Sequence, residues 1–217
     1  MKRDIRLAVF DLDGTLADTA PDMVVAMSKV TAKYGEFRDL GALLRSYLGE
    51  GVYVLFDKLY AHLGLPAEHA DDIAAYKREY AANCTACSRP YPGTLPMLRG
   101  LKERGVQVAV ATMKPKMATG KVLHDLGIEP YVDLWLAQDD MLRPKPDPWC
   151  VEECARRCGV SPQETLVAGD SLVDVQAAQA AGALSVAVMG GYFNQEAMRK
   201  SGADVTITDI KEVLSLI

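Results

Sequence analysis

The sequence predicts an α/β fold in which a doubly wound parallel sheet carries an inserted, all-helical cap. Ile5 to Phe10 is an apolar run broken only by Arg6, which is typical of a strand buried in a parallel sheet. The next stretch, residues 16–88, contains helix-like segments and no strand-like run of any length. From Tyr91 onward, strand-like and helix-like segments alternate, and this alternation is the pattern of a doubly wound sheet.

Four helices are expected in the insert, because apolar residues recur there at helical spacing between turn residues. Thr19 or Asp18 can cap the first helix, with Pro21 in its first turn and Gly35 at its end. The second covers residues 40–48 and stops at Gly49-Glu50-Gly51. The third and fourth cover residues 52–63 and 70–86.

The alternating part of the chain predicts five more strands and five helices. The strands are expected at residues 106–111, 132–136, 165–168, 184–188 and 205–208, and the helices at 95–104, 117–126, 149–158, 173–181 and 210–216. The expected domains are therefore a discontinuous Rossmann-like core, residues 1–15 and 89–217, and a helical cap, residues 16–88.

Composition indicates an ordinary globular protein. The chain has 217 residues, of which 49% are hydrophobic and 24% charged, with a net charge of −5. This balance implies no affinity for nucleic acid or for an acidic membrane surface. No apolar run approaches membrane-spanning length, and no signal-peptide core follows the N-terminus, so we expect a cytoplasmic monomer or homodimer.

The five cysteines do not form a recognisable metal or disulfide pattern. Cys84 and Cys87 form one Cys-x-x-Cys with no partner at zinc-ribbon spacing. Cys150, Cys154 and Cys158 recur every fourth residue and so form one helix face. We interpret them as packing residues.

Two carboxylates follow the first strand. Asp11 and Asp13 are two residues apart, so in an extended chain both side chains leave from the same face, and Gly14 and Thr15 then form a turn. Carboxylates this close repel one another unless a cation neutralises them or one of them holds a proton. Mg²⁺ takes oxygen ligands of this kind together with substrate phosphate, so the pair predicts a magnesium site.

Polar residues follow other predicted strands as well. Thr112 follows residues 106–111, Asp170 follows 165–168 with Asp174 one helical turn later, and Lys145 lies in a proline-rich loop after the strand at 132–136. Ligands of open parallel sheets bind at the carboxyl ends of the strands. Each residue alone is commonplace, but acids, a hydroxyl and an ammonium together at this edge predict a phosphate site.

These segments resemble the motifs of the haloacid dehalogenase superfamily, most of whose members are magnesium-dependent phosphatases. Residues 11–16, Asp-Leu-Asp-Gly-Thr-Leu, resemble the first motif, and Thr112 and Lys145 resemble the second and third. Gly169-Asp170-Ser171-x-x-Asp174 resembles the fourth, and a helical insert after the first motif is similar to the superfamily's C1 cap.

Within the superfamily, the chain most resembles phosphoglycolate phosphatases. The similarity rests on residues 18–21 (Asp-Thr-Ala-Pro), Arg45-x-x-x-Gly49-x-Gly51, Pro92-Gly93 and Gly191-Tyr192. The chain departs from that family at Met113, where Asn is usual. Met cannot make the hydrogen bond that Asn would offer near the phosphate, and this concerns the substrate more than the chemistry.

The resemblance implies roles for each residue. Asp11 would be the nucleophile that forms an aspartyl-phosphate, and Asp13 the general acid and base. Asp11, the Asp13 backbone carbonyl and Asp170 would hold Mg²⁺, and Thr112 and Lys145 the phosphate of a small phosphorylated metabolite. Asp174 would orient Lys145 or a metal-bound water rather than bind the metal directly. In the cap, the candidates for reading the leaving group are Arg45, Gly49 and Gly51.

Two alternative functions remain open from the sequence. A phosphomutase of the β-phosphoglucomutase type would share the nucleophile and metal but return the phosphoryl group to a sugar. A signalling receiver domain also uses Asp, Thr and Lys around magnesium, and Asp139 would then be its phosphorylated residue. A receiver has no cap, so the insert argues against that second alternative.

Overall fold

The protein is built on one six-stranded parallel sheet. The computed structural model describes residues 4–49 and 51–217. The strands are β1 (Leu7–Phe10), β4 (Gln107–Ala111), β5 (Leu134–Leu136), β6 (Thr165–Gly169), β7 (Leu184–Val188) and β8 (Val205–Ile207), in the order β5-β4-β1-β6-β7-β8. In register, Phe10 lies opposite Val110 on β4 and Ala168 on β6, so the segments that follow these strands start at one edge of the sheet.

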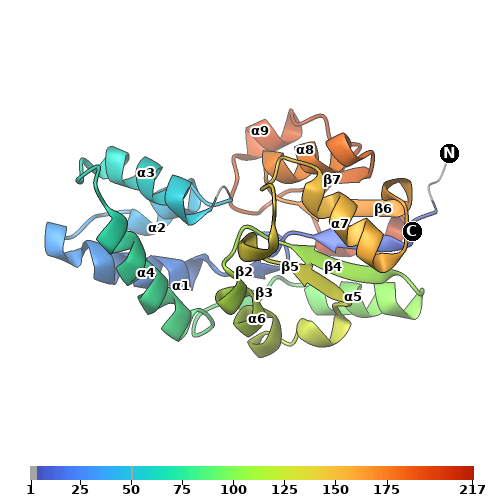
Figure 1. The fold of residues 1–217 in the computed structure, drawn as a ribbon, viewed down its shortest axis with the longest axis horizontal. Helices are drawn as coiled ribbons and strands as arrows, with labels where there is room; N and C mark the ends of the chain where they lie inside the picture. The colour runs from blue at the N-terminus through green and yellow to red at the C-terminus, as the bar shows by residue number, and fades with distance from the viewer. Residues whose placement is uncertain (1–3, 50) are drawn as a thin grey trace.

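Alternate side chains of β1 pack into different apolar clusters, as strand geometry requires. Ala8 and Phe10 belong to a cluster with residues of α5 (Thr94–Glu103) and α6 (Lys116–Asp125). Leu7 and Val9 pack with α7 (Trp149–Cys158) and α8 (Leu172–Ala181). Figure 1 shows α5 and α6 below the sheet and α7 and α8 above it. The predicted doubly wound fold is confirmed.

Cys150 and Cys154 are fully buried in the α7 cluster, and this confirms their interpretation as packing residues. Cys84 is buried and Cys87 is exposed, and all five cysteines are free thiols.

The inserted helices form a second body beside the sheet, at the left of Figure 1. They are α1 (Ala20–Thr31), the 3₁₀ turn η1 (Ala32–Tyr34), α2 (Leu40–Arg45), α3 (Val52–Leu63) and α4 (Ala70–Asn83). Aromatic rings join α3 to α4, because the ring centroid of Phe56 on α3 lies 5.4 Å from that of Tyr76 on α4. Within α3, the Phe56 ring also contacts that of Tyr60, with centroids 5.1 Å apart. Short helices have low stability on their own, and the burial of these rings stabilises the helices of the cap.

A two-stranded antiparallel ribbon, which the sequence did not predict, joins cap to core. It pairs β2 (Ala17–Asp18) with β3 (Arg89–Pro90), so the chain's two crossings lie side by side. The Tyr91 amide and the Thr94 hydroxyl also donate to the Leu16 carbonyl, at 3.0 and 2.9 Å. Strands of two residues are too short to show a periodic pattern of apolar residues, so these two were not predicted from the sequence.

Several short helices complete the core. They are η2 (Glu129–Tyr131), η3 (Gln138–Asp140), η4 (Pro162–Glu164) and α9 (Gln195–Arg199), none of which was predicted. The expected last α-helix is instead a 3₁₀ helix, η5 (Ile210–Ser215), with Asp209 and Glu212 in a capping box at its start. Among the described residues, no helix is long and apolar enough to cross a membrane.

Candidate active site

The Lys145 ammonium joins two buried carboxylates from different parts of the core, Asp11 directly after β1 and Asp174 in the first turn of α8. Its Nζ lies 2.9 Å from Asp11 Oδ1 and 2.5 Å from Asp174 Oδ1, and it also donates to the Ala111 carbonyl at 3.1 Å. Asp11 is 9% exposed and Lys145 8%. The predicted contact between Lys145 and Asp174 is therefore present in the structure, with Asp11 added to it.

The charges of this group stabilise one another. Burial opposes the charge of Lys145, but Asp11 and Asp174 raise the pKa of its ammonium above the ordinary value, so it stays protonated. Burial raises the pKa of Asp11, while Lys145 lowers it. A further cation beside Asp11 would therefore favour the ionised form of its carboxyl group.

Asp170 is the third buried carboxylate, and the backbone around it is shaped to admit it. Its oxygens accept from the Thr15 hydroxyl at 3.0 Å and from the Tyr192 amide at 2.7 Å. A Cβ at Gly14 or at Gly191 would overlap the Asp170 carboxyl, so glycine is required on both sides of it. Burial and, after it, the Asp174 carboxylate raise the pKa of Asp170 to about 7, although the hydrogen bonds from Tyr192 and Thr15 oppose this rise.

This arrangement fits a divalent cation. Carboxylate oxygens of Asp11, Asp170 and Asp174 all lie within 4.8 Å of one another. Oxygen donors are what Mg²⁺ prefers, and a bound cation would favour the charged forms of the two carboxyls whose pKa values burial raises. Asp174 is already paired with the Lys145 ammonium, whereas Asp170 accepts from the uncharged Thr15 hydroxyl and Tyr192 amide, so the charge of Asp170 is the less neutralised of the two and suits a cation better.

Asp13 has partners different from those of the three clustered acids. Its Oδ1 accepts from Lys114 Nζ at 2.7 Å and from the Thr19 hydroxyl at 2.6 Å. The Lys114 ammonium is also 4.9 Å from the centroid of the Tyr80 ring in the cap. Lys114 follows Thr112-Met113 in the sequence, but only the fold shows that it reaches Asp13.

Thr112 lies where β4 ends. Its amide donates to the Leu136 carbonyl on β5 at 3.0 Å, and its hydroxyl accepts from the Lys114 amide at 3.2 Å. The side chain is buried in the wall of the same pocket as Asp11 and Asp13.

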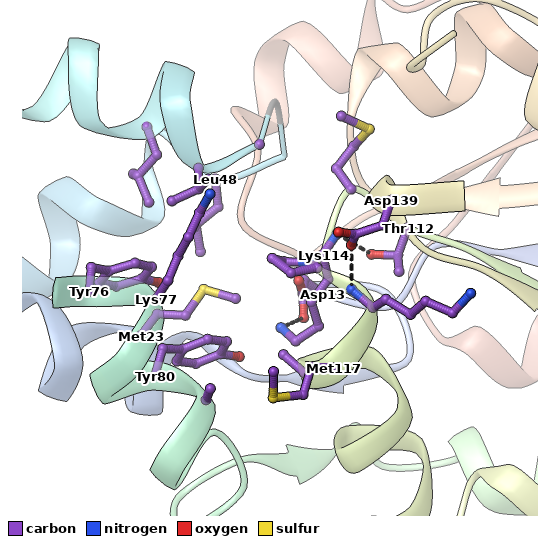
Figure 2. A pocket seen from close by; sticks show the side chains of 18 of the residues that line it. Asp13, Met23, Leu48, Tyr76, Lys77, Tyr80, Thr112, Lys114, Met117 and Asp139 are labelled. Carbon is purple, nitrogen blue, oxygen red and sulfur yellow. Dashed lines mark hydrogen bonds and ion pairs between the residues drawn. The ribbon is translucent and has the colours of Figure 1, made fainter. Parts of the chain in front are cut away.

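The pocket lies between core and cap and has a volume of about 250 Å³. Figure 2 shows Met23, Tyr76 and Tyr80 on the cap side facing Asp13 and Lys114 on the core side. The core contributes the polar residues and the cap mainly apolar ones. The lining residues include Asp11, Asp13, Thr112, Lys114, Met113, Met117, Met23, Leu48, Val52, Leu55, Tyr76 and Tyr80.

The cap candidates occupy two different places. Gly49 and Gly51 line the pocket: a Cβ at Gly51 would lie 3.6 Å from the Met113 methyl carbon and one at Gly49 3.6 Å from Ser171 Cβ. Arg45 is not among the lining residues. It donates to Asp18 Oδ1 at 3.0 Å, and its guanidinium lies 5.3 Å from the centroid of the Tyr192 ring.

Tyr192 connects the acid cluster to the start of the cap. Its hydroxyl donates to Asp18 Oδ1 at 2.6 Å and accepts from the amides of Thr19 and Ala20 at 2.7 and 2.9 Å. Its own amide holds Asp170. Tyr192 was assigned no role from the sequence. Its partners Asp170 and Thr19 lie 22 and 173 positions away in the chain, and only the fold brings them to it.

Asp139, the phosphorylated residue in the receiver alternative, lies apart from Lys145. Its carboxylate accepts from the Lys116 amide at 2.6 Å, at the start of α6. The Lys145 ammonium contacts Asp11 and not Asp139. The geometry therefore disfavours a receiver domain.

Known proteins with similar sequences and structures point to one family. A family model for haloacid dehalogenase-like hydrolases matches residues 5–182. Phosphoglycolate phosphatase from Thiobacillus denitrificans is 33% identical over 218 residues, covering 98% of this chain and 96% of the relative. Phosphoglycolate phosphatase 1 from Pseudomonas aeruginosa is 30% identical over 213 residues, covering 96% of this chain and 78% of the relative.

The fold has a close match among crystal structures. One described as a predicted phosphoglycolate phosphatase from Haemophilus somnus has a TM-score of 0.89 and 26% identity, and the match covers 98% of each chain. The similarity includes the cap, since it extends over nearly the whole chain.

Proposed function

Since this chain belongs to the haloacid dehalogenase-like hydrolase family, we propose that it hydrolyses a small phosphate monoester through an aspartyl-phosphate on Asp11, with Mg²⁺ as cofactor. The chain is a phosphoric monoester hydrolase of the phosphoglycolate phosphatase type by its relatives. The observation that best supports the mechanism is the convergence of Lys145, Asp11 and Asp170 at the carboxyl edge of the sheet.

Asp11 would attack phosphorus in line with the leaving oxygen. Lys145, fixed by Asp174, would hold one phosphate oxygen and Thr112 another, so the anionic substrate meets a cation prepared in advance. Asp13 would give a proton to the leaving oxygen and then take one from the attacking water. Its contacts with Lys114 and Thr19 fix the direction of its carboxylate.

Asp11, Asp170 and the Asp13 carbonyl would hold Mg²⁺, which supplies positive charge against the like charges of nucleophile and phosphate. The fit rests on the three clustered carboxylates and on the glycines that surround Asp170. The raised pKa values of Asp11 and Asp170 also fit a site whose charge a cation completes.

The test is phosphate release from a panel of small esters, 2-phosphoglycolate included, with and without Mg²⁺. We expect turnover that needs Mg²⁺ and that Asp11→Asn abolishes, while Asp57→Asn, a matched change on the exposed surface of α3, leaves it intact. Turnover by Asp11→Asn at the wild-type rate would contradict the proposal. Analysis of products from sugar phosphates separates hydrolysis from the mutase alternative, which would yield an isomeric sugar phosphate.

A further inference from the structure

The wall of the pocket opposite the catalytic carboxylates is apolar. Met23, Leu55 and Tyr76 come from cap helices, while Met113 and Met117 come from the core. Met117 is 75% exposed, which is unusual for a large apolar side chain and places it at an open edge of the pocket. Met23, Leu55 and Tyr76 are already buried, so a leaving group with an apolar surface would remove mainly Met117 from water on binding.

One polar atom in this apolar wall lacks a partner. Tyr80 is 5% exposed, and within the described part of the chain its hydroxyl makes no hydrogen bond. Buried hydroxyls nearly always have a partner, and leaving one without costs free energy. In Figure 2 the Tyr80 hydroxyl points into the pocket, toward Asp13 and Met117. The oxygen itself is covered in this structure, so a bound molecule could pair with it only after a small shift of the side chains around it.

The Tyr80 ring is fixed before any ligand arrives. It stacks on Tyr76 with ring centroids 5.7 Å apart and an interplanar angle of 2°. On another side lies the Lys114 ammonium, 4.9 Å from the ring centroid, which also contacts Asp13. A ring held in this way presents its hydroxyl in one direction and loses little conformational entropy on binding.

A glycolate carboxylate, in contrast, would meet few available charges. The lysines that line the pocket, in the ranges described, are Lys77, Lys114 and Lys116. Lys114 contacts Asp13, and Lys116 Nζ lies 2.5 Å from Asp140, so both charges are paired with an acid. Lys77 Nζ donates to the uncharged Tyr53 hydroxyl at 2.9 Å, so its charge is the one that a carboxylate at this pocket could meet. Arg45, the other cap cation considered, is bound to Asp18.

We propose that the preferred substrates are phosphate monoesters of an alcohol with a flat apolar body and one hydrogen-bonding group, and that Tyr80 binds this group. Their ring would lie among Met113, Met117 and Tyr76, and their phosphate at Lys145 and Thr112. This substrate class rests on the proposed phosphatase function and refines it, because it replaces a small carboxylate leaving group by a ring.

The first experiment compares kcat/KM for benzyl phosphate, ethyl phosphate and 2-phosphoglycolate with Mg²⁺. All three release an aliphatic alkoxide, so the comparison avoids the advantage that a phenol leaving group would bring. We expect benzyl phosphate to exceed both others by at least about tenfold, since even one methylene in an apolar pocket changes kcat/KM by this much. A higher kcat/KM for 2-phosphoglycolate would overturn the substrate class while leaving the phosphatase function intact.

The second experiment adds a polar group to the ring. 3-Hydroxybenzyl and 4-carbamoylbenzyl phosphate are compared with benzyl phosphate in the wild type and in Tyr80→Phe. We expect at least one polar ester to gain about tenfold in kcat/KM over benzyl phosphate, the value of one hydrogen bond, and to lose that gain in Tyr80→Phe. The gain is measured in each protein as the ratio of kcat/KM for the polar ester to that for benzyl phosphate, so an effect of Tyr80→Phe that is common to both esters cancels.

Tyr47→Phe is the matched control, because Tyr47 lies in the cap outside the pocket, where its hydroxyl contacts His62. It should keep the gain. Absence of any gain in the wild type, or its persistence in Tyr80→Phe, would overturn the role of Tyr80. Met113→Asn gives an independent check on the wall: it should lower kcat/KM for benzyl phosphate relative to ethyl phosphate, and an unchanged ratio would contradict the apolar contact.

Discussion

At the scale of single residues, the site depends on one buried ammonium. Lys145 lies between Asp11 and Asp174 and is almost inaccessible to water. A buried ion pair adds little net stability, but removing one member leaves the others uncompensated. Lys145 thus has two separable effects, on phosphate binding and on the fold around the acids.

We predict that Lys145→Met lowers kcat by roughly 10²–10³-fold, because a cation that faces the transferring phosphoryl group is lost. It should also lower the free energy of unfolding by about 3 kcal/mol in the absence of Mg²⁺, because buried carboxylates lose their partner. Phosphate-release assays and urea titrations measure the two effects. Lys102→Met, at an exposed pair with Asp133, is the control. Wild-type kcat in Lys145→Met would show that this ammonium does not hold the phosphoryl group.

The residues at the strand ends could be predicted because they need only two facts, where each strand ends and that the strands are parallel. Asp11, Asp170 and Lys145 were found in this way. Tyr80 and Lys114 were not assigned roles, because their contacts cross from cap to core and no local pattern encodes them. Arg45 was expected to read the leaving group, whereas the structure places it on Asp18 and Tyr192.

At the scale of elements, a buried carboxylate connects several helices of the cap to one another. Asp72 on α4 accepts from the hydroxyls of Tyr34 and Tyr60 at 2.8 and 3.0 Å, and Lys33 also contacts it. Burial alone would raise the pKa of Asp72, but the Lys33 ammonium and the two hydroxyls hold that pKa below its ordinary value. The charged form therefore stabilises the folded cap.

The sign of the pH effect follows from that lowered pKa. The stabilisation is fully present above the ordinary carboxyl pKa of about 4, and it is lost as the pH falls through the lower folded value. We predict that Asp72→Asn costs about 2 kcal/mol of unfolding free energy at neutral pH and progressively less toward pH 3. Urea titrations across this range measure the difference from wild type. A cost that stays constant over the whole range would contradict the role given to the charge.

The connection between cap and core depends on Asp22, in the first turn of α1. Its carboxylate accepts from the amides of Cys87 and Ser88, at 2.9 and 2.7 Å, and from the Ser88 hydroxyl at 2.6 Å. It thereby connects the segment in which the chain enters the cap to the segment in which it returns to the core.

We predict that Asp22→Ala lowers the free energy of unfolding by about 2 kcal/mol, because two backbone amides lose their acceptor. Ser88→Ala removes only the hydroxyl contact and should cost less than half as much. Both free energies of unfolding are measured by urea titration. If the two variants lost equal amounts, the amide contacts would not stabilise the connection between cap and core.

Among the elements, agreement is best where glycines or prolines bound a long pattern. Val52–Leu63, Trp149–Cys158 and Leu184–Val188 match the prediction residue for residue. The ribbon of β2 and β3, the short α9 and the 3₁₀ form of η5 could not be read, because a few residues cannot establish a period. Their form depends on tertiary contacts and caps.

At the scale of the whole molecule, the parallel sheet brings distant segments to one edge, and the cap encloses the space above it. Lys145 is 134 residues from Asp11 and Asp170 is 155 residues from Thr15, yet both pairs are hydrogen-bonded. The order of strands was not needed to predict this convergence. The shape and chemistry of the pocket were not predictable, since they depend on how the cap is placed over the core.

The most direct test of the proposed chemistry is to trap the covalent intermediate. The protein is quenched during turnover of a phosphate ester with Mg²⁺ and reduced with tritiated borohydride, which expels phosphate from an aspartyl-phosphate and leaves a tritium-labelled alcohol in its place. The labelled peptides are then mapped by mass, and we predict label at Asp11 only when Mg²⁺ is present. Label at Asp139, or steady turnover with no label on any peptide, would contradict the assignment of Asp11 as nucleophile.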